Sequence, residues 1–193
     1  MKLFILAVAL VSSAMAATVT LTMDEVANQP INGLTVSKGG ESFTFSNPSG
    51  TLLYNSGGPG SLTFVQDPSI QGTTAPFGIA FALPVYSIRF GLAELTPAPV
   101  TGMATVNLFF NSVVPFATMS FNSSLVDPFA EGQFTFSGGP VSNILITPNA
   151  GPPNLAFDNL TVNTAAPEPS TFAMLVGAAA LAAARILRRR RDM

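Results

Sequence analysis

Carboxylates are the side chains of this sequence that could carry out chemistry, because its 193 residues include no histidine and no cysteine. Their absence excludes a Ser-His-Asp triad, a Cys-His nucleophile and most zinc or copper sites. A glycosidase needs only a pair of Asp or Glu side chains. Sugar-cleaving clefts also carry stacking aromatic side chains, and Tyr54 and Tyr86 are the amphipathic aromatic residues here, since tryptophan is absent. We therefore expect a protein that is not an enzyme.

Three carboxylates could hold a metal ion instead. Asp24 and Glu25 come at the end of the first expected strand, and Asp158 lies on the last one. The first and last strands of a jelly roll commonly run side by side, so these side chains could offer Ca²⁺ the hard oxygen ligands that it prefers. The other interpretation is that they are surface acids beside turns. A structural calcium ion is the cofactor that the sequence suggests.

The middle of the chain, residues 17–164, is acidic. It contains two cations, Lys38 and Arg89, and eight carboxylates, which gives a net charge of −6. It has no basic patch for phosphate backbones, and we expect no nucleic acid partner. The segment Gly57-Gly58-Pro59-Gly60 lacks the Lys-Ser/Thr pair and the following helix of a phosphate-binding loop, so we expect a turn there.

Short alternating segments predict an all-β fold for this middle part. Phe43–Ser46 and Gln133–Ser137 alternate apolar and polar residues, as a half-buried strand does. Clusters of Gly, Pro, Asn and Ser separate many such segments, which is typical of an antiparallel β-sandwich, here expected to be jelly-roll-like. The other expected strands are Val19–Met23, Leu62–Val65, Phe77–Leu83, Val85–Phe90, Ala104–Phe110, Phe116–Phe121, Ile144–Thr147 and Leu155–Val162.

Residues 1–16 have the order of a secretory signal peptide. Lys2 precedes an apolar run that reaches Val11, and Ala14-Met15-Ala16 then supplies the small-x-small pattern of a cleavage site. Ala14 and Ala16 are the residues that the peptidase would read. The alternative is a buried strand or helix at the start of a domain. We expect export and cleavage after Ala16.

Residues 165–193 have the order of a membrane tail. Pro167-Glu168-Pro169 precedes an apolar run, Ser170–Leu187, whose 18 residues would span about 27 Å as a single transmembrane helix. The four arginines Arg188, Arg189, Arg190 and Arg191 follow it and favour the cytoplasmic side. An amphipathic helix packed on the domain is a poor alternative, because the run is apolar on every face.

Signal peptide, Pro-Glu-Pro, apolar span and terminal arginines together resemble the PEP-CTERM sorting signal of exported bacterial proteins. The resemblance implies that Pro167, Glu168 and Pro169 form the sorting motif and that Arg188 to Arg191 stop the chain in the membrane. It also implies a partner, the inner-membrane protease-transpeptidase called exosortase. The chain would then pass through an inner-membrane-anchored intermediate to the cell surface or extracellular matrix.

The middle of the chain resembles the β-sandwich domains that are common in PEP-CTERM proteins. The resemblance is carried by Leu21–Glu25 and Ile31–Ser37 near its start and by Ala156–Val162 at its close. Such domains are compared with jelly-roll lectins and carbohydrate-binding modules. Two functions stay open. A smooth surface of Ser and Thr would favour a structural matrix protein, which we prefer, and an exposed Tyr54 or Tyr86 beside a concave face would favour a non-catalytic module that binds extracellular polysaccharide.

Overall fold

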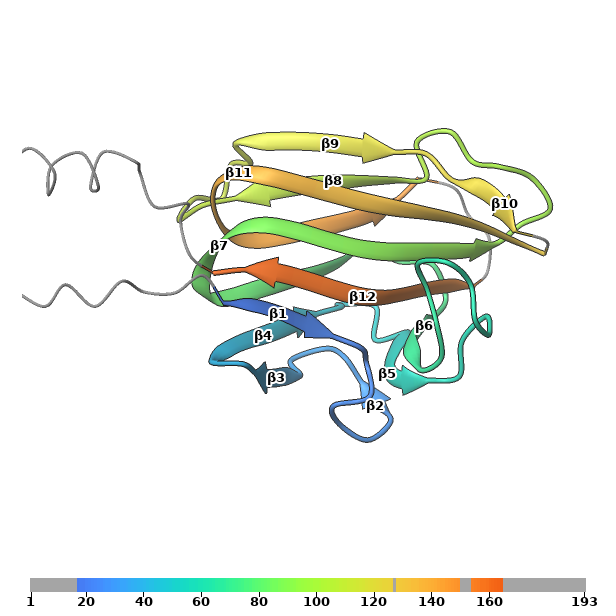
Figure 1. Ribbon diagram of the computed structural model, residues 1–193, viewed down its shortest axis with the longest axis horizontal. Coiled ribbons are helices and arrows are strands. Elements are labelled where there is room, and N and C mark those ends of the chain that lie inside the picture. The colour runs from blue at the N-terminus through green and yellow to red at the C-terminus, as the bar shows by residue number, and fades with distance from the viewer. Residues whose placement is uncertain (1–16, 127, 150–153, 165–193) are drawn as a thin grey trace, which may run out of the picture.

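The computed structural model describes residues 17–126, 128–149 and 154–164. This part of the chain is all-β and forms twelve strands, every pair of them antiparallel, and contains no helix (Figure 1). The strands are β1 (Thr18–Leu21), β2 (Gln29–Pro30), β3 (Thr35–Lys38), β4 (Glu41–Ser46), β5 (Leu52–Ser56), β6 (Ser69–Gly72), β7 (Phe77–Leu95), β8 (Ala104–Phe109), β9 (Ala117–Phe121), β10 (Ser124–Val126), β11 (Phe129–Pro148) and β12 (Leu155–Asn163). The expected signal peptide, sorting motif and transmembrane helix lie outside the described residues. Within them, no helix is long and apolar enough to cross a membrane.

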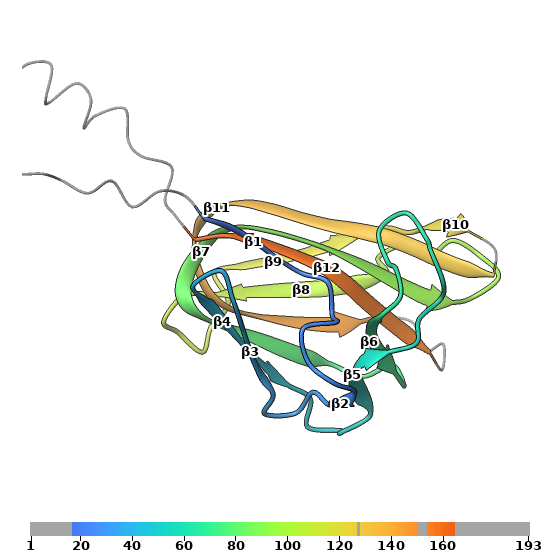
Figure 2. The same ribbon diagram turned by 60° about the horizontal axis from the view of Figure 1, so that its bottom comes forward.

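Two long bent strands, β7 and β11, join the two layers of a sandwich-like fold. In one layer, the first half of β7 pairs with β4 and with the second half of β11, and β3, β8 and β9 extend this layer. In the other layer, the second half of β7 pairs with β12 and with the first half of β11, and β10 lies beside β11. The far edge of β12 pairs with β1 and, further along, with β6, which leads to β5 and β2 (Figures 1 and 2).

The bends occur where the sequence weakens strand pairing. Pro84 has no N–H to donate in the middle of β7, and Gly138-Gly139-Pro140 interrupts β11, whose register to β7 shifts between Ser137 and Asn143. Each strand therefore crosses from one layer to the other without a separate loop. We expected two strands at Phe77–Leu83 and Val85–Phe90, and the structure shows one continuous strand through Pro84.

Phenylalanine fills the space between the layers. Phe77 of one layer meets Phe157 of the other with ring centroids 5.2 Å apart, and Phe90 meets Phe121 across the layers at 6.0 Å. Phe90 also stacks on Phe134 at 4.9 Å. Burying one such side chain stabilises the fold by about 1.5–3 kcal/mol. The aromatic core thus accounts for a fold without disulfides.

The first and last described strands lie side by side, as we expected. Val19 of β1 pairs with Val162 of β12, and Thr164 donates its backbone N–H to the carbonyl of Ala17 over 3.2 Å. The expected strand at Leu62–Val65 is wrong, since these residues belong to a loop over the outer face of the sheet. Gly57-Gly58-Pro59-Gly60 begins the same loop and is not a strand, in agreement with the expected turn.

Candidate functional site

Glu25, expected as a calcium ligand, is engaged in hydrogen bonds. Lys38 donates to its Oε1 over 2.7 Å, the backbone N–H of Thr22 donates to the same atom over 2.9 Å, and the Tyr54 hydroxyl donates to Oε2 over 2.5 Å. Burial raises the pKa of Glu25, but the bonds from Lys38, Tyr54 and Thr22 outweigh it and lower the pKa to about 2. This carboxylate holds its loop in place as a permanent anion.

Tyr54 cannot serve as a sugar platform, because its side chain is completely buried. Its ring packs edge-on against Phe45 at 5.7 Å, and its hydroxyl is bound to Glu25. Burial and the negative charge of Glu25 both raise the pKa of Tyr54, so its hydroxyl stays protonated. Tyr86 is half-buried at the bend of β7.

The described residues do not bring Asp24, Glu25 and Asp158 together as a three-carboxylate group, and calcium binding to them stays a prediction. In the described part of the chain, no three acidic side chains are grouped so as to hold a metal ion. Asp24 is exposed and accepts a hydrogen bond from the hydroxyl of Thr22 over 2.7 Å. Asp158 is buried, accepts one bond from the backbone N–H of Gln66 over 3.0 Å, and its Oδ1 has no partner. Burial raises the pKa of Asp158 to about 6, and the charges of Glu25 and Asp24 add to this increase.

Three further buried carboxylates, Glu41, Glu94 and Glu131, escaped the sequence analysis. Glu131 on β11 accepts the backbone N–H groups of Thr63, Phe64 and Val65 over 3.1, 2.5 and 2.7 Å, which fastens the loop that we expected to be a strand. Glu94 on β7 is buried with both carboxylate oxygens unpartnered, and burial raises its pKa to about 7. Glu131 has a structural role, and burial disfavours the charged form of Glu94.

The outer-face loop rests on small side chains. Ala93 of β7, Ala156 of β12 and Val65 of the loop form a separate buried cluster. A Cβ at Gly91 would lie 2.2 Å from the carbonyl oxygen of Phe64, so the loop backbone lies directly on the sheet at that point. Glycine and alanine at these outward-facing positions were the signal in the sequence that something covers this face.

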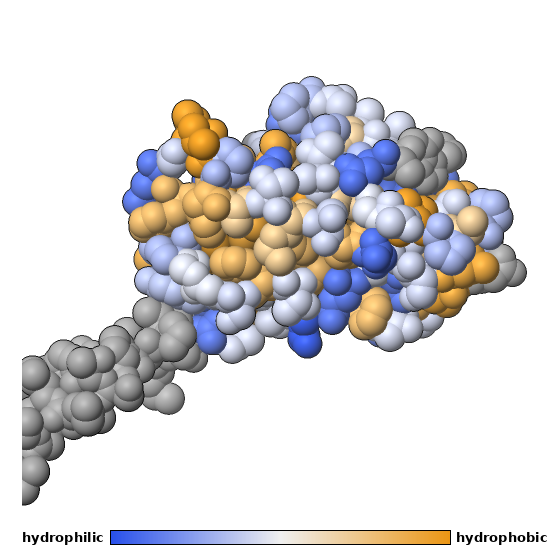
Figure 3. All heavy atoms as spheres, turned by 90° about the horizontal axis from the view of Figure 1, so that it is seen from above, coloured by the Kyte–Doolittle hydropathy of each residue, from blue (hydrophilic) through white to orange (hydrophobic). Residues whose placement is uncertain are grey.

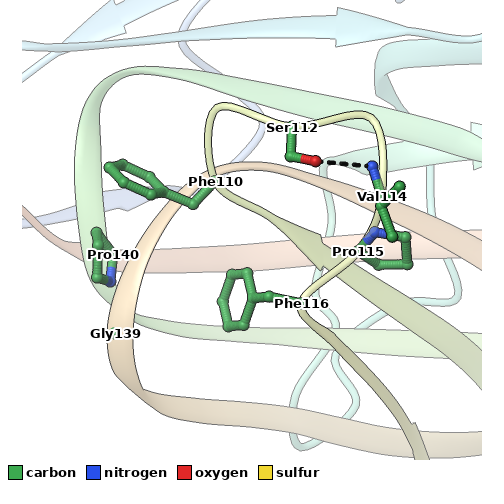
Figure 4. A pocket seen from close by; sticks show the side chains of 7 residues that line it. All are labelled: Phe110, Ser112, Val114, Pro115, Phe116, Gly139 and Pro140. Carbon is green, nitrogen blue, oxygen red and sulfur yellow. Dashed lines mark hydrogen bonds between the residues drawn. The ribbon is translucent and has the colours of Figure 1, made fainter.

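An open apolar hollow of about 470 Å³ lies at the end of the strands away from the outer-face loop. Its lining comes from the β8–β9 connection and the bend of β11, and consists of Phe110, Ser112, Val114, Pro115, Phe116, Gly139 and Pro140 (Figure 4). The ring of Phe116 also meets Phe136 at 6.3 Å. We name this feature the end pocket. The sequence analysis missed it, because its two sides come from segments that are distant in the chain.

The end pocket has almost no polar chemistry. Its one side-chain hydroxyl, that of Ser112, accepts a hydrogen bond from the backbone N–H of Val114 over 3.0 Å (Figure 4). None of the lining residues carries an acid, a base or a charge. Such a hollow can hold apolar groups or stack against a ring, but it offers no group for proton transfer or nucleophilic attack.

No protein-family model matches the chain, and no curated protein matches it. Among solved structures, the chain is similar to family 29 carbohydrate-binding modules. A mutant of one such module is 9% identical with a TM-score of 0.39, covering 80% of this chain and 99% of that one. A second mutant is 8% identical with a TM-score of 0.39, covering 77% and 93%, and a further family 29 module is 10% identical with a TM-score of 0.34, covering 77% and 89%. At these TM-scores no residue of this chain is matched to a binding residue of those modules.

Proposed function

We propose that this chain is an exported, non-catalytic protein of the bacterial surface or extracellular matrix, sorted by a C-terminal tail of the PEP-CTERM type. The observation that carries the proposal is the pairing of the two domain ends. β1 and β12 pair from Thr18 to Leu21, and Thr164 is bonded to Ala17. A jelly-roll-like domain closed in this way gives a processed N-terminus and a sorting tail the same point of attachment.

The described surface supports a structural role. Neighbouring strands bind each other through hydroxyl pairs, with Thr35 and Thr44 3.0 Å apart and Ser37 and Ser42 2.7 Å apart. Charged residues make up only 9% of the chain, against about 25% in an average soluble domain. The uncharged polar surface is the one that we associated with a matrix protein, and the buried Tyr54 removes one of the two sugar platforms considered.

The sorting step would use the tail as a transient anchor. Pro167, Glu168 and Pro169 would be recognised outside the membrane while Ser170–Leu187 spans it and the arginines resist translocation. Ala-rich spans gain less from burial than Leu-rich ones, since each buried CH₂ contributes about 0.8 kcal/mol. A weak anchor suits a segment that is removed by an exosortase.

A host with and without its sorting enzyme tests this proposal. Mass spectrometry of the purified protein should find Ala17 as the N-terminus in both hosts, and a shortened C-terminus only where the enzyme is present. Glu168→Ala should leave the chain long and membrane-bound. Pro97→Ala, in the Pro-Ala-Pro segment at Pro97–Pro99, is the matched control and should be processed normally. Equal length and location in both hosts would refute the sorting proposal.

Carbohydrate binding is the second candidate function, and the exposed rings of Phe110 and Phe116 are the observation that favours it. Aromatic faces can stack on sugar rings, although the end pocket lacks the fixed polar groups that usually orient sugar hydroxyls. Migration of the protein in gels containing the host's own exopolysaccharide tests this function. Phe116→Ala should abolish retardation and Leu125→Ala, at the far end, should not; an unretarded wild-type protein contradicts carbohydrate binding.

A further inference from the structure

The end pocket lies at the same end of the sandwich as the two domain termini. Asn163 of β12 pairs with Ser87 of β7, which pairs with Ser137 of β11, so these residues mark one level. At that level β7 and β11 turn into the other layer, where Asn143 of β11 pairs with Phe109 of β8. The connection after Phe109 therefore emerges at the end where Ala17 and Thr164 lie (Figures 1 and 2).

This end is apolar and unusually exposed. The β8–β9 connection places Val113 at 94% exposure, Val114 at 67% and Phe116 at 50%, and Leu83 at the bend of β7 is also 50% exposed. In Figure 3 a group of hydrophobic residues projects at the upper left of the molecule, and hydrophobic residues are also exposed at its right-hand end. We name this set, with Phe110, the apolar tip. Large apolar side chains gathered on a loop tip indicate a contact surface, because loops in water are normally polar.

The carboxylates on the strands lie mostly at the other end of the sandwich, away from the apolar tip. Asp158 pairs with Gly91, Glu131 with Ala93, and Glu94 with Leu155, all toward the end away from the termini. Among the described strands, Glu41 is the one carboxylate that lies at the end with the apolar tip, and it is buried and bound to the backbone N–H groups of Ala82 and Leu83. The apolar tip thus faces outward without the negative charges that an anionic surface would repel.

The chain beyond Thr164 limits what can lie against this end. Five residues separate Thr164 from Ser170, where the apolar run of the tail begins. A chain rises at most about 3.3–3.6 Å per residue, so Ser170 lies no more than about 22 Å from Thr164. If that run crosses a bilayer, the end of the sandwich with the apolar tip is held at the lipid headgroups.

We propose that the apolar tip inserts into the outer face of the membrane while the tail anchors the chain, and so sets the domain upright on the bilayer. This inference rests on the membrane-anchored step of the proposed function. Val113 and Val114 are the most exposed of these side chains and would enter first, and the less exposed rings of Phe110 and Phe116 would remain at headgroup depth, where aromatic side chains are favoured. The end pocket is then the space between these rings that acyl or headgroup carbon enters, which its apolar lining suits better than a sugar.

The absence of tryptophan makes this proposal directly measurable. Val113→Trp introduces a single tryptophan at a side chain exposed enough to leave the fold intact. Leu125→Trp is the matched control, because Leu125 is an exposed leucine on β10 opposite Ala130, at the far end of the sandwich. Both full-length variants are reconstituted into phosphatidylglycerol–phosphatidylcholine vesicles, with and without brominated acyl chains, and flotation first establishes that they are bound to vesicles.

The tryptophan of Val113→Trp should emit at shorter wavelength in vesicles and be quenched by brominated lipid, and that of Leu125→Trp should show neither change. Adding Val114→Asp to Val113→Trp should abolish the quenching while flotation persists. Failure to float would overturn the proposed membrane anchor and this inference with it. Flotation without quenching would overturn the inference alone, as would a wavelength shift that depends on protein concentration, which indicates a second copy, or on added polysaccharide, which indicates a sugar site.

Discussion

Replacing Glu94 with glutamine should make the domain more stable in neutral and alkaline solution. Glu94 follows Phe90 and Leu92 at every second position of β7, so its side chain lies on the same core face as theirs. Its partners on the neighbouring strands are Ala130 and Leu155. Both its oxygens are buried without a hydrogen-bond partner. Glutamine keeps the shape and removes the ionisation, so the substitution isolates the cost of a buried charge.

The size of the effect follows from the pKa of Glu94, which burial raises from 4.5 to about 7. Between these two values the folded state holds a proton that the unfolded state has lost, so stability falls as pH rises through this window. At about 1.36 kcal/mol per pKa unit, the full difference corresponds to about 3 kcal/mol, and local relaxation reduces it to about 1–3 kcal/mol. The Glu94→Gln domain should lack this loss.

Urea denaturation of residues 17–164 measures the effect, at about pH 5 and about pH 9. The two proteins should be similar in free energy of unfolding at the lower pH. Asp158, whose pKa burial raises to about 6, destabilises both proteins alike as it ionises, so its contribution cancels in the comparison. At the higher pH the variant should be more stable by about 1–3 kcal/mol. Parallel pH profiles, or a variant that is less stable at high pH, would refute this account of Glu94.

Three other substitutions or treatments test the remaining carboxylates. Glu25→Gln should destabilise the domain at neutral pH. Because the folded pKa of Glu25 is lowered, the wild type loses stability as pH falls from about 4.5 toward about 2, and the variant should lack this loss. Urea denaturation at neutral pH and at about pH 2 measures both effects, and a variant more stable than the wild type at neutral pH would contradict them. Glu131→Gln should cost about 1–3 kcal/mol and speed hydrogen exchange at Phe64 and Val65, and unchanged exchange there would contradict its role in holding the loop. Chelator should leave the melting temperature unchanged, since Glu25 is already bound by Lys38 and Tyr54. A melting temperature lowered by chelator would instead support calcium binding at these carboxylates.

Local alternation predicted the strands whose two faces differ. Glu41–Ser46 alternates buried and more exposed residues, as the pattern Phe-Thr-Phe-Ser indicates. The same four residue types at Phe134–Ser137 of β11 also alternate in exposure. Leu62–Val65 failed because a short apolar run has the composition of a strand whether or not a partner strand lies beside it. The backbone N–H groups of Thr63, Phe64 and Val65 are satisfied instead by Glu131, which is more than sixty residues away in the chain. No local pattern contains that information.

The candidate sites show the same division between local and distant information. The sequence placed Asp24 and Glu25 near Asp158 correctly in strand order, since β1 and β12 do pair. It could not show that Lys38 and Tyr54, from two other strands, occupy the carboxylate of Glu25. The apolar tip did leave a local trace, because the segment from Phe110 to Phe116 joins two strands without a single charged residue.

The carboxylates that first suggested chemistry act mainly as cross-links between distant backbone segments. Glu41 binds the backbone at the bend of β7, Glu131 binds the outer-face loop, and Asp158 binds Gln66 at the end of that loop. A buried carboxylate that accepts backbone N–H groups forms charge-assisted bonds, which are about twice as strong as neutral ones. In a chain without cysteine, such bonds fix loops that small secreted domains commonly fix with disulfides. Catalysis would need these oxygens to be free to meet a substrate, and each of these three buried acids has at least one oxygen already bound; Glu94 is the fourth buried acid of the described chain, and neither of its oxygens has a partner.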